Sequence, residues 1–425
     1  MKKYITNIKT LAVLLIAGSS LTACSDDNTL DNQPAQPSGK QVYTMTVTAG
    51  KSGNGTTRAL SLDDSTMNAT WTAGDKVSVY KGETLLGELT AQSGGLSTVL
   101  KGTLTGDIAV ADNLTLKFLS PAYESQDGTL DYIAEHCDYA TSTIEVASVE
   151  GGTITTTADA DFQNQQAIVK FTLKDADGSA NISASNLKLS VGNYSFTFTP
   201  VSTTSDFYLA IPTVSNVNVA LVSTVGSATY DYAKTGVSFT NDNYYQVNVR
   251  MSECVDLASV TEAHKGRIIG VDGKIYSNIL SATTAGTTPS AMVGYVGSKN
   301  DQWGLDSYSS VYNHGLAIAL TPVKNTDGDE GYESMYFATA DYAAPAYKRA
   351  RPTNTSAWFL PSRTQLSNTI FTANRFGLIG SNDSYWSSTS SVNDSRYRMA
   401  YGFGSNKWIE GSSTNTAYTR SVFAF

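Results

Sequence analysis

Histidine and cysteine are the rarest reactive side chains in this sequence, with three of each among 425 residues. So few leave little material for a His/Cys metal site or for a histidine-dependent nucleophile, although carboxylate chemistry stays open. Basic residues are outnumbered, with 29 Lys and Arg against 38 Asp and Glu, and the formal charge of −9 would repel nucleic acid. Charged residues make up only 16% of the chain against 41% hydrophobic ones, which excludes a disordered protein.

The abundant residues point to β-structure. The chain has 24 Tyr and 34 Gly, with many Thr and Ser, against ten Pro, a composition typical of short strands joined by turns. Its length suits two or three domains, each large enough to bury its own core. We therefore predict a mainly β protein with few long helices.

The first residues have the features of an export signal. Three lysines precede an apolar stretch at residues 11–17, which is too short to span a bilayer. Leu21-Thr22-Ala23-Cys24 then resembles a bacterial lipobox, which implies a lipoprotein signal peptide over residues 1–23 and acylation, for example by palmitate, of Cys24. An ordinary signal peptide in which Cys24 has no role is the alternative. The polar residues 24–40 predict a tether between membrane and fold.

A half-buried strand is predicted directly after the tether. In residues 41–48 the apolar Tyr43, Met45 and Val47 alternate with threonines. A Gly- and Ser-containing loop follows, with Arg58 near its end, a composition that proteases cut. Further strands are predicted at residues 76–80, 114–119, 167–173, 194–198 and 245–250.

Four segments in the first 250 residues resemble the fimbrillin family of bacterial surface pilins: Thr57-Arg58-Ala59, the run from Trp71 to Tyr80 that includes Gly74-Asp75, the strand from Phe162 to Phe171, and the run from Asn243 to Val249. The resemblance implies two tandem transthyretin-like β-sandwich domains, at residues 41–160 and 161–252. Taken alone, Trp71 is predicted to be a core residue.

The same resemblance implies how such a chain would assemble. Cleavage between Arg58 and Ala59 would release the anchor with the first strand, and a strand from another pilin subunit would replace it by donor-strand exchange. Loss of Tyr43, Met45 and Val47 would uncover an apolar groove and an unpaired edge. The alternative is that Arg58 is a solvated loop residue and that the lipid stays attached.

The last 170 residues have a different character, because four of the five Trp lie there among Gly-bounded apolar runs. Segments such as Trp358-Phe-Leu-Pro361-Ser362 and Tyr385-Trp386-Ser387 resemble a C-type-lectin-like domain, which implies an α+β fold over residues 255–425. Ser362 is predicted to cap a helix with three inward side chains, Leu366, Ile370 and Phe371. Trp358, Trp386 and Phe423 are predicted core residues, and residues 420–425 an integral last strand.

This segment departs from calcium-dependent lectins. The tripeptides Glu-Pro-Asn, Gln-Pro-Asp and Trp-Asn-Asp are absent from it, and so are the cysteines of animal members and of cysteine-oxidising relatives. The acidic residues 325–331 lack EF-hand spacing and are predicted to form a solvated turn. We therefore predict no metal and no cofactor. Cys137 and Cys254 are left either paired in a disulfide or buried and free.

Ring stacking next to polar groups is another way to bind sugars. The residues with this composition are taken as a tentative ligand-binding set: Trp303, Tyr308, Asn382, Asp383, Tyr385, Arg396, Tyr397 and Trp408.

These observations predict a non-enzymatic fimbrial tip subunit, an adhesin of the outer membrane and cell surface. Its expected partners are other pilin subunits, a carbohydrate or host-protein ligand, and the membrane before processing. One alternative is a lipid-anchored surface glycan-binding protein that does not polymerise. An enzyme acting on surface polysaccharide is another, although no convincing catalytic pair is found.

Overall fold

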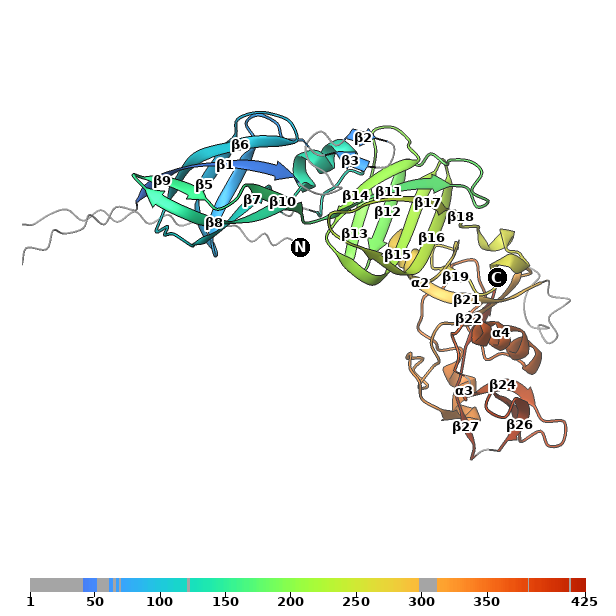
Figure 1. Cartoon of the computed structure of the whole chain (residues 1–425). Helices are drawn as coiled ribbons and strands as arrows, with labels where there is room; N and C mark the ends of the chain where they lie inside the picture. The colour runs from blue at the N-terminus through green and yellow to red at the C-terminus, as the bar shows by residue number, and fades with distance from the viewer. Residues whose placement is uncertain are drawn as a thin grey trace, which may run out of the picture. The chain divides into compact units, whose positions relative to one another are not determined.

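A computed structural model describes residues 41–51, 61–63, 66–68, 70–120, 123–297, 312–380, 382–412 and 414–425 (Figure 1). Strands dominate the described residues, which confirms the mainly β prediction. Residues 41–425 form one compact unit. The strands predicted at residues 41–48, 76–80, 114–119, 167–173, 194–198 and 245–250 are present, within three residues at either end. The segment from Phe162 to Phe171, expected to be one strand, is divided between two strands, at residues 160–164 and 167–174.

The first sheet has eight strands and closes on itself. Its order is β10 (Ala160–Asn164), β1 (Val42–Lys51), β6 (Ser97–Thr105), β5 (Thr84–Ala91), β4 (Lys76–Lys81), β7 (Asn113–Phe118), β8 (Ala140–Glu150) and β9 (Thr153–Thr156). Additional pairings of β10 with β8 and of β1 with β9 complete the ring. A short hairpin, β2 (Ser61–Asp63) and β3 (Thr66–Asn68), lies outside this sheet. This part is therefore one closed sheet, where two separate sheets of a sandwich were expected.

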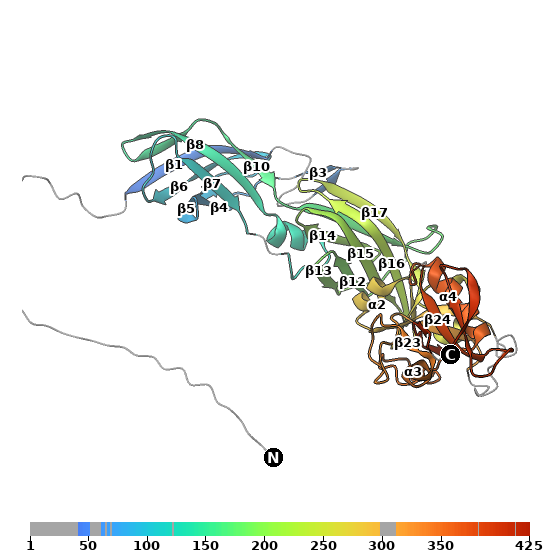
Figure 2. The same ribbon diagram turned by 90° about the horizontal axis from the view of Figure 1, so that it is seen from below.

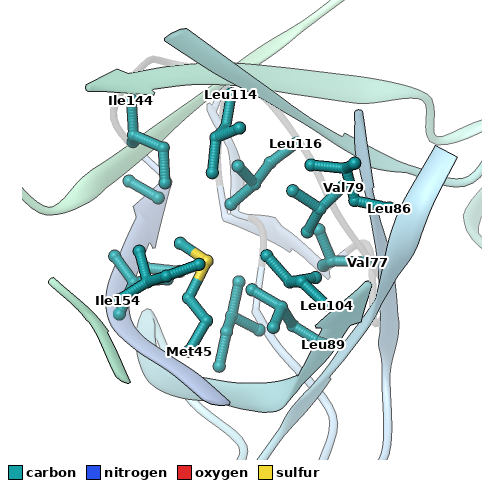
Figure 3. Packing of buried hydrophobic residues seen from close by; sticks show 14 of the residues in the cluster. Met45, Val77, Val79, Leu86, Leu89, Leu104, Leu114, Leu116, Ile144 and Ile154 are labelled. Atoms are coloured by element: carbon teal, nitrogen blue, oxygen red, sulfur yellow. The ribbon is translucent and has the colours of Figure 1, made fainter. Parts of the chain in front are cut away.

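The inner face of the first sheet is filled by alternate side chains of its strands. Figure 3 shows Met45, Leu89, Leu104 and Ile154 pointing into one apolar core. Trp71 is buried there as predicted. Its ring makes T-shaped contacts with the rings of Phe118 and Phe162.

Gly74 explains the turn that precedes β4. Its φ of 95° lies in the left-handed region that favours glycine. The Thr72 N–H donates to Asp75 Oδ2 at 3.0 Å, which closes the turn. The Gly74-Asp75 pair is thus a turn element, and β4 starts directly after it.

The second part of the chain is a sandwich of two sheets around a common core. The three-stranded sheet has the order β14 (Asp206–Ile211), β11 (Ala167–Lys174) and β17 (Tyr244–Arg250). The five-stranded sheet has the order β13 (Tyr194–Phe198), β12 (Asn186–Val191), β15 (Val214–Val225), β16 (Ala228–Phe239) and β18 (Ser252–Glu253). Figure 2 shows β12, β15 and β16 side by side. The connection from β7 to β8 contributes α1 (Leu130–Tyr132) and the π-helical turn η1 (Ile133–Cys137).

The last part combines helices with three small sheets. Its largest sheet has the order β20 (Ile275–Tyr276), β19 (Ile268–Gly270), β21 (Pro289–Val296), β22 (Gly315–Ala319) and β28 (Val422–Ala424). The others are β23 (Met335–Tyr336) with β27 (Thr416–Ala417), and β24 (Ser384–Ser390), β25 (Arg398–Gly402) and β26 (Lys407–Gly411). The helices are the 3₁₀ turns η2 (Leu257–Ser259) and η3 (Glu262–His264), then α2 (Ile279–Ala285), α3 (Phe337–Ala343) and α4 (Arg363–Arg375).

Helix α4 begins where Ser362 predicts it. The Ser362 hydroxyl accepts from the Gln365 N–H, and the Gln365 side chain accepts from the Ser362 N–H, which forms a capping box. Leu366 and Ile370 are fully buried, as predicted. The prediction that Phe371 faces inward is wrong, because this side chain is 46% exposed. Its ring makes T-shaped contacts with the rings of Tyr401 and Phe403.

Three predicted core aromatics of this part are confirmed. Trp358, Trp386 and Phe423 are all buried, and the Trp358 and Phe423 rings meet edge to face at 4.8 Å. Each indole N–H is satisfied, since Trp358 donates to Arg349 O and Trp386 to Met335 O. Cys137 and Cys254, whose pairing the sequence left open, are both buried, and no disulfide joins these two described residues.

Candidate functional site

Strand β1 closes the first sheet from both of its edges. It pairs antiparallel with β6 from Val42 opposite Thr105 to Gly50 opposite Ser97. Its other edge pairs parallel, first with β9 at Thr44 and Met45 and then with β10 from Ala49 to Lys51. Strand β1 is therefore an interior strand of the ring, although it is the first of the described strands.

The side chains of β1 alternate between core and solvent. Tyr43, Met45 and Val47 are buried, which confirms the predicted inward face, and Ala49 continues it. The intervening threonines are exposed. The alternation predicts a strand that stops before Ala49-Gly50, whereas β1 continues through both residues to Lys51.

Removal of β1 would destabilise the first sheet, because buried side chains and backbone hydrogen bonds would both be lost. Each of the three large side chains contributes on the order of 1.5–3 kcal/mol by its burial. Both β6 and the pair β9 and β10 would also lose ladder partners, and an unsatisfied backbone group in an apolar setting is unfavourable. The gap left behind would be a groove shaped for another alternating strand.

The residues predicted for processing fall outside the described ranges. Arg58 and Ala59 come between β1 and β2 in the sequence, and Cys24 precedes the described chain. Trp303 and Tyr308, from the tentative ligand-binding set, also lie outside the described ranges. Cleavage, acylation and ligand contacts at these five positions stay predictions.

Four other members of the tentative set meet on one small sheet. Tyr385 of β24 is opposite Tyr401 of β25, which is opposite Trp408 of β26. Asn382 and Asp383 directly precede β24 and reach the turn after β25, where the Phe403 N–H donates to Asp383 O.

Arg396 and Tyr397 are not part of this group. They precede Arg398, which begins β25, whereas Asp383 lies at the other end of that strand, about 13 Å away for five extended residues. Arg396 forms a two-pronged ion pair with Asp394, and the hydrogen bonds from Arg396 hold the pKa of the Asp394 carboxyl below its usual range. The tentative set is thus divided between two ends of the sheet.

Tyr385 is enclosed in the core, with 0% of its surface exposed. Its ring therefore has no face open to a sugar, and the prediction that it stacks on a ligand is wrong in this respect. Its hydroxyl donates to Asp383 Oδ2 at 3.0 Å, and burial raises its pKa. Tyr385 thus orients a neighbouring carboxylate and offers no stacking surface of its own.

Trp408 is half-buried, and its ring is already in contact on two sides. The Arg363 guanidinium lies 5.0 Å from the ring centroid, in a cation–π arrangement, and the Tyr401 ring meets it edge to face. The polar groups Asn382 and Asp383 border this aromatic cluster. The sequence did not predict that Arg363 contacts Trp408. A basic residue in the first turn of a helix is common and does not by itself indicate such a contact.

The acidic loop at residues 325–331 is held by ion pairs. Asp329 pairs with Lys348 at 2.7 Å, and the Arg349 Nε–H donates to Glu330 Oε1 at 2.8 Å. These hydrogen bonds lower the pKa of both carboxyls. Within the described residues, no group of three or more His, Cys, Asp or Glu side chains has the geometry of a metal site.

Comparisons with known proteins gave structural similarities only. No protein-family model and no curated relative matches the chain. The structure is similar to that of a fimbrial protein from Bacteroides ovatus, with 14% identity and a TM-score of 0.27, covering 91% of this chain and 100% of that one. It is also similar to a fimbrial assembly protein from Parabacteroides distasonis, with 11% identity and a TM-score of 0.29, covering 51% and 95%.

A third similar structure is a tip fimbrial protein from Porphyromonas gingivalis with C-terminal truncation, with 10% identity and a TM-score of 0.29, covering 50% of this chain and 99% of that one. None of the helices in the described ranges combines the length and the apolar character needed to cross a membrane.

Proposed function

We propose that this protein is a fimbrial tip subunit and adhesin. Proteolysis after Arg58 removes β1 together with the lipid anchor on Cys24, and a strand from a neighbouring pilin subunit takes its place. The C-terminal α+β part, proposed to be lectin-like, presents a ligand-binding surface at the end of the filament. Its binding residues are proposed to include Asn382, Asp383 and Trp408.

The contrast between the first and the last strand carries this proposal. Among the described strands, β1 is the only one that a cut between β1 and β2 would separate from the rest of its sheet. Strand β28, by comparison, is fixed at the end of the chain by the buried Phe423 and Phe425. The His314 and Gly315 N–H groups both donate to Phe425 O. Once β1 has been removed, a chain built in this way could accept a strand in its place, whereas donation of β28 would open its own core.

The rival function, a lipid-anchored glycan-binding protein that does not polymerise, is favoured by one observation. The ring of the first sheet is complete with its own β1 in place. An uncut chain would therefore be stable on the membrane without any partner.

The mass of the protein in filaments sheared from cells separates the two functions. A polypeptide that begins at Ala59 supports strand exchange, and one that begins at acylated Cys24 supports the rival. Arg58→Ala is expected to abolish the shorter form, whereas the control Lys51→Ala leaves it unchanged. Immunogold labelling along the whole shaft would contradict a position at the tip.

A further inference from the structure

A recess of about 890 Å³ lies at the second sandwich, and none of its lining residues belongs to β1 or to the tentative ligand-binding set. Three tyrosines line it, Tyr123, Tyr132 and Tyr194, together with Phe196 and the polar residues Glu124, Ser125, Asn193 and Ser195. We call it the tyrosine recess.

One wall of the tyrosine recess is the connection from β7 to β8, which is fixed on the edge of β14. The Gln126 carboxamide bonds both backbone groups of Ala210, donating to its C=O and accepting from its N–H, each at 2.7 Å. The Tyr208 N–H donates to Gly128 O at 2.8 Å. A Cβ at Gly128, whose φ is 85°, would lie 3.1 Å from the rings of Phe198 and Phe207. This wall therefore has little freedom to move.

The other wall is the hairpin of β12 and β13. Among the described strands, β13 pairs only with β12, and residues 193–196, at its start, line the recess. Tyr194 is 38% exposed, and its ring is nearly parallel to that of Phe196, at 13° and 6.4 Å between centroids. Phe196 in turn stacks on Phe198. This ladder of rings anchors the Tyr194 ring while leaving part of it open to solvent.

The side chains of the two walls have complementary chemistry. Aromatic faces attract the C–H groups on the flat side of a sugar ring, and carboxylate, carboxamide and hydroxyl groups bond sugar hydroxyls. Glu124, Asn193 and Ser195 are exposed beside the rings. Among the described residues that line the recess, Glu124 alone is charged, so an anionic ligand such as a sialylated or sulfated sugar would be repelled.

We propose that the tyrosine recess binds a neutral oligosaccharide, with sugar rings against Tyr194 and Tyr132 and hydroxyl groups on Glu124 and Asn193. Both walls are in place before the ligand arrives, so little conformational entropy is lost on binding. The site is independent of strand exchange and of the C-terminal surface. It would give the subunit a second sugar contact on a different part of the chain.

The test is binding of the full chain without its signal peptide to an array of neutral, sialylated and sulfated oligosaccharides. We expect neutral oligosaccharides to bind. Tyr194→Ala and Tyr132→Ala should each weaken that binding about tenfold, whereas Tyr194→Phe, which keeps the ring, should retain most of it. Tyr342→Ala, at a tyrosine of α3 that is also exposed, is the matched control and should have no effect.

Three results would overturn the proposal: no binding to any neutral oligosaccharide, binding that both alanine variants leave unchanged, or a preference for anionic sugars. Near-UV circular dichroism of each variant checks that its fold is retained.

Discussion

Met45 of β1 lies beside Ile154 of β9, on a parallel pair of strands that are more than a hundred residues apart in the sequence. Neither side chain has more than 1% of its surface exposed (Figure 3). The first strand of the chain is thus fixed to the last strands of the same sheet. Loss of β1 would open the ring at that point, and this makes β1 the decisive element of the proposed assembly.

Met45→Ala is expected to destabilise the chain by about 2–5 kcal/mol, because a cavity would remain in a close-packed core. Thr46→Ala, at the adjacent exposed position of the same strand, should change stability by less than about 0.5 kcal/mol. Urea unfolding of both variants measures the difference. Equal effects would show that β1 does not contribute its inner face to the core.

Gln126→Ala is expected to leave both backbone groups of Ala210 without their partner, at a cost of about 1–3 kcal/mol. Hydrogen exchange of the Ala210 amide should accelerate, while the amides of the neighbouring β11 stay protected. The exposed Gln92 is a matched control, since its carboxamide bonds only one carbonyl, that of Thr90. Unchanged exchange at Ala210 would contradict the role of Gln126 as a cover for the edge of β14.

The thiols of Cys137 and Cys254 are expected to be unreactive in the folded protein. Burial raises the pKa of Cys137 to about 12 and raises that of Cys254 as well, so both stay protonated at pH 8, whereas the thiolate is the reactive form. In a Cys24→Ser variant, a thiol reagent should label neither cysteine in buffer and both in urea. Rapid labelling without denaturant would contradict their burial.

Glu330→Gln tests the ion pair of the acidic loop. Hydrogen bonds from Arg349 hold the pKa of Glu330 below its ordinary value near 4.5, so its contribution is present above that pH and is lost as the pH falls through the folded-state value. The variant should lose at most about 1 kcal/mol at pH 7, since Glu330 is partly exposed.

The difference in stability between Glu330→Gln and the parent chain should be smaller at pH 3 than at pH 7. Thermal unfolding at both pH values measures this difference. Glu333→Gln, at an exposed glutamate nearby, is the control and should behave like the parent chain at both pH values. A deficit for Glu330→Gln that is larger at pH 3 would contradict the sign of the pKa shift.

The local sequence pattern predicts the position and the buried face of an element where one side of that element packs against the core. Tyr43, Met45 and Val47 alternate because one side of β1 meets the core, and Ser362 marks the start of α4 because its hydroxyl caps the first turn. Phe371 was misplaced because the buried stripe of α4 follows Leu366, Thr369, Ile370 and Ala373. An aromatic residue next to that stripe has the right composition but the wrong angle around the helix.

Long-range relationships could not be predicted from local pattern. No periodicity within residues 41–51 indicates that β1 pairs with β9 and β10, because these pairings depend on the path of the whole sheet. Tyr385 has the same composition signal whether it faces a ligand or the core, and burial decides between them. The tyrosine recess likewise draws on separate segments, around residues 123–132 and 193–196, that only the fold brings together.

The most direct test of strand exchange uses the chain cut after Arg58 and separated from its N-terminal fragment, then mixed with a synthetic peptide of residues 41–51. We predict that the peptide binds one to one and raises the melting temperature of the cut chain. The same peptide with Met45→Asp should do neither, because its charge would enter an apolar groove. A cut chain that melts like the intact one and ignores both peptides would contradict the account, since β1 would then not be the strand that closes the sheet.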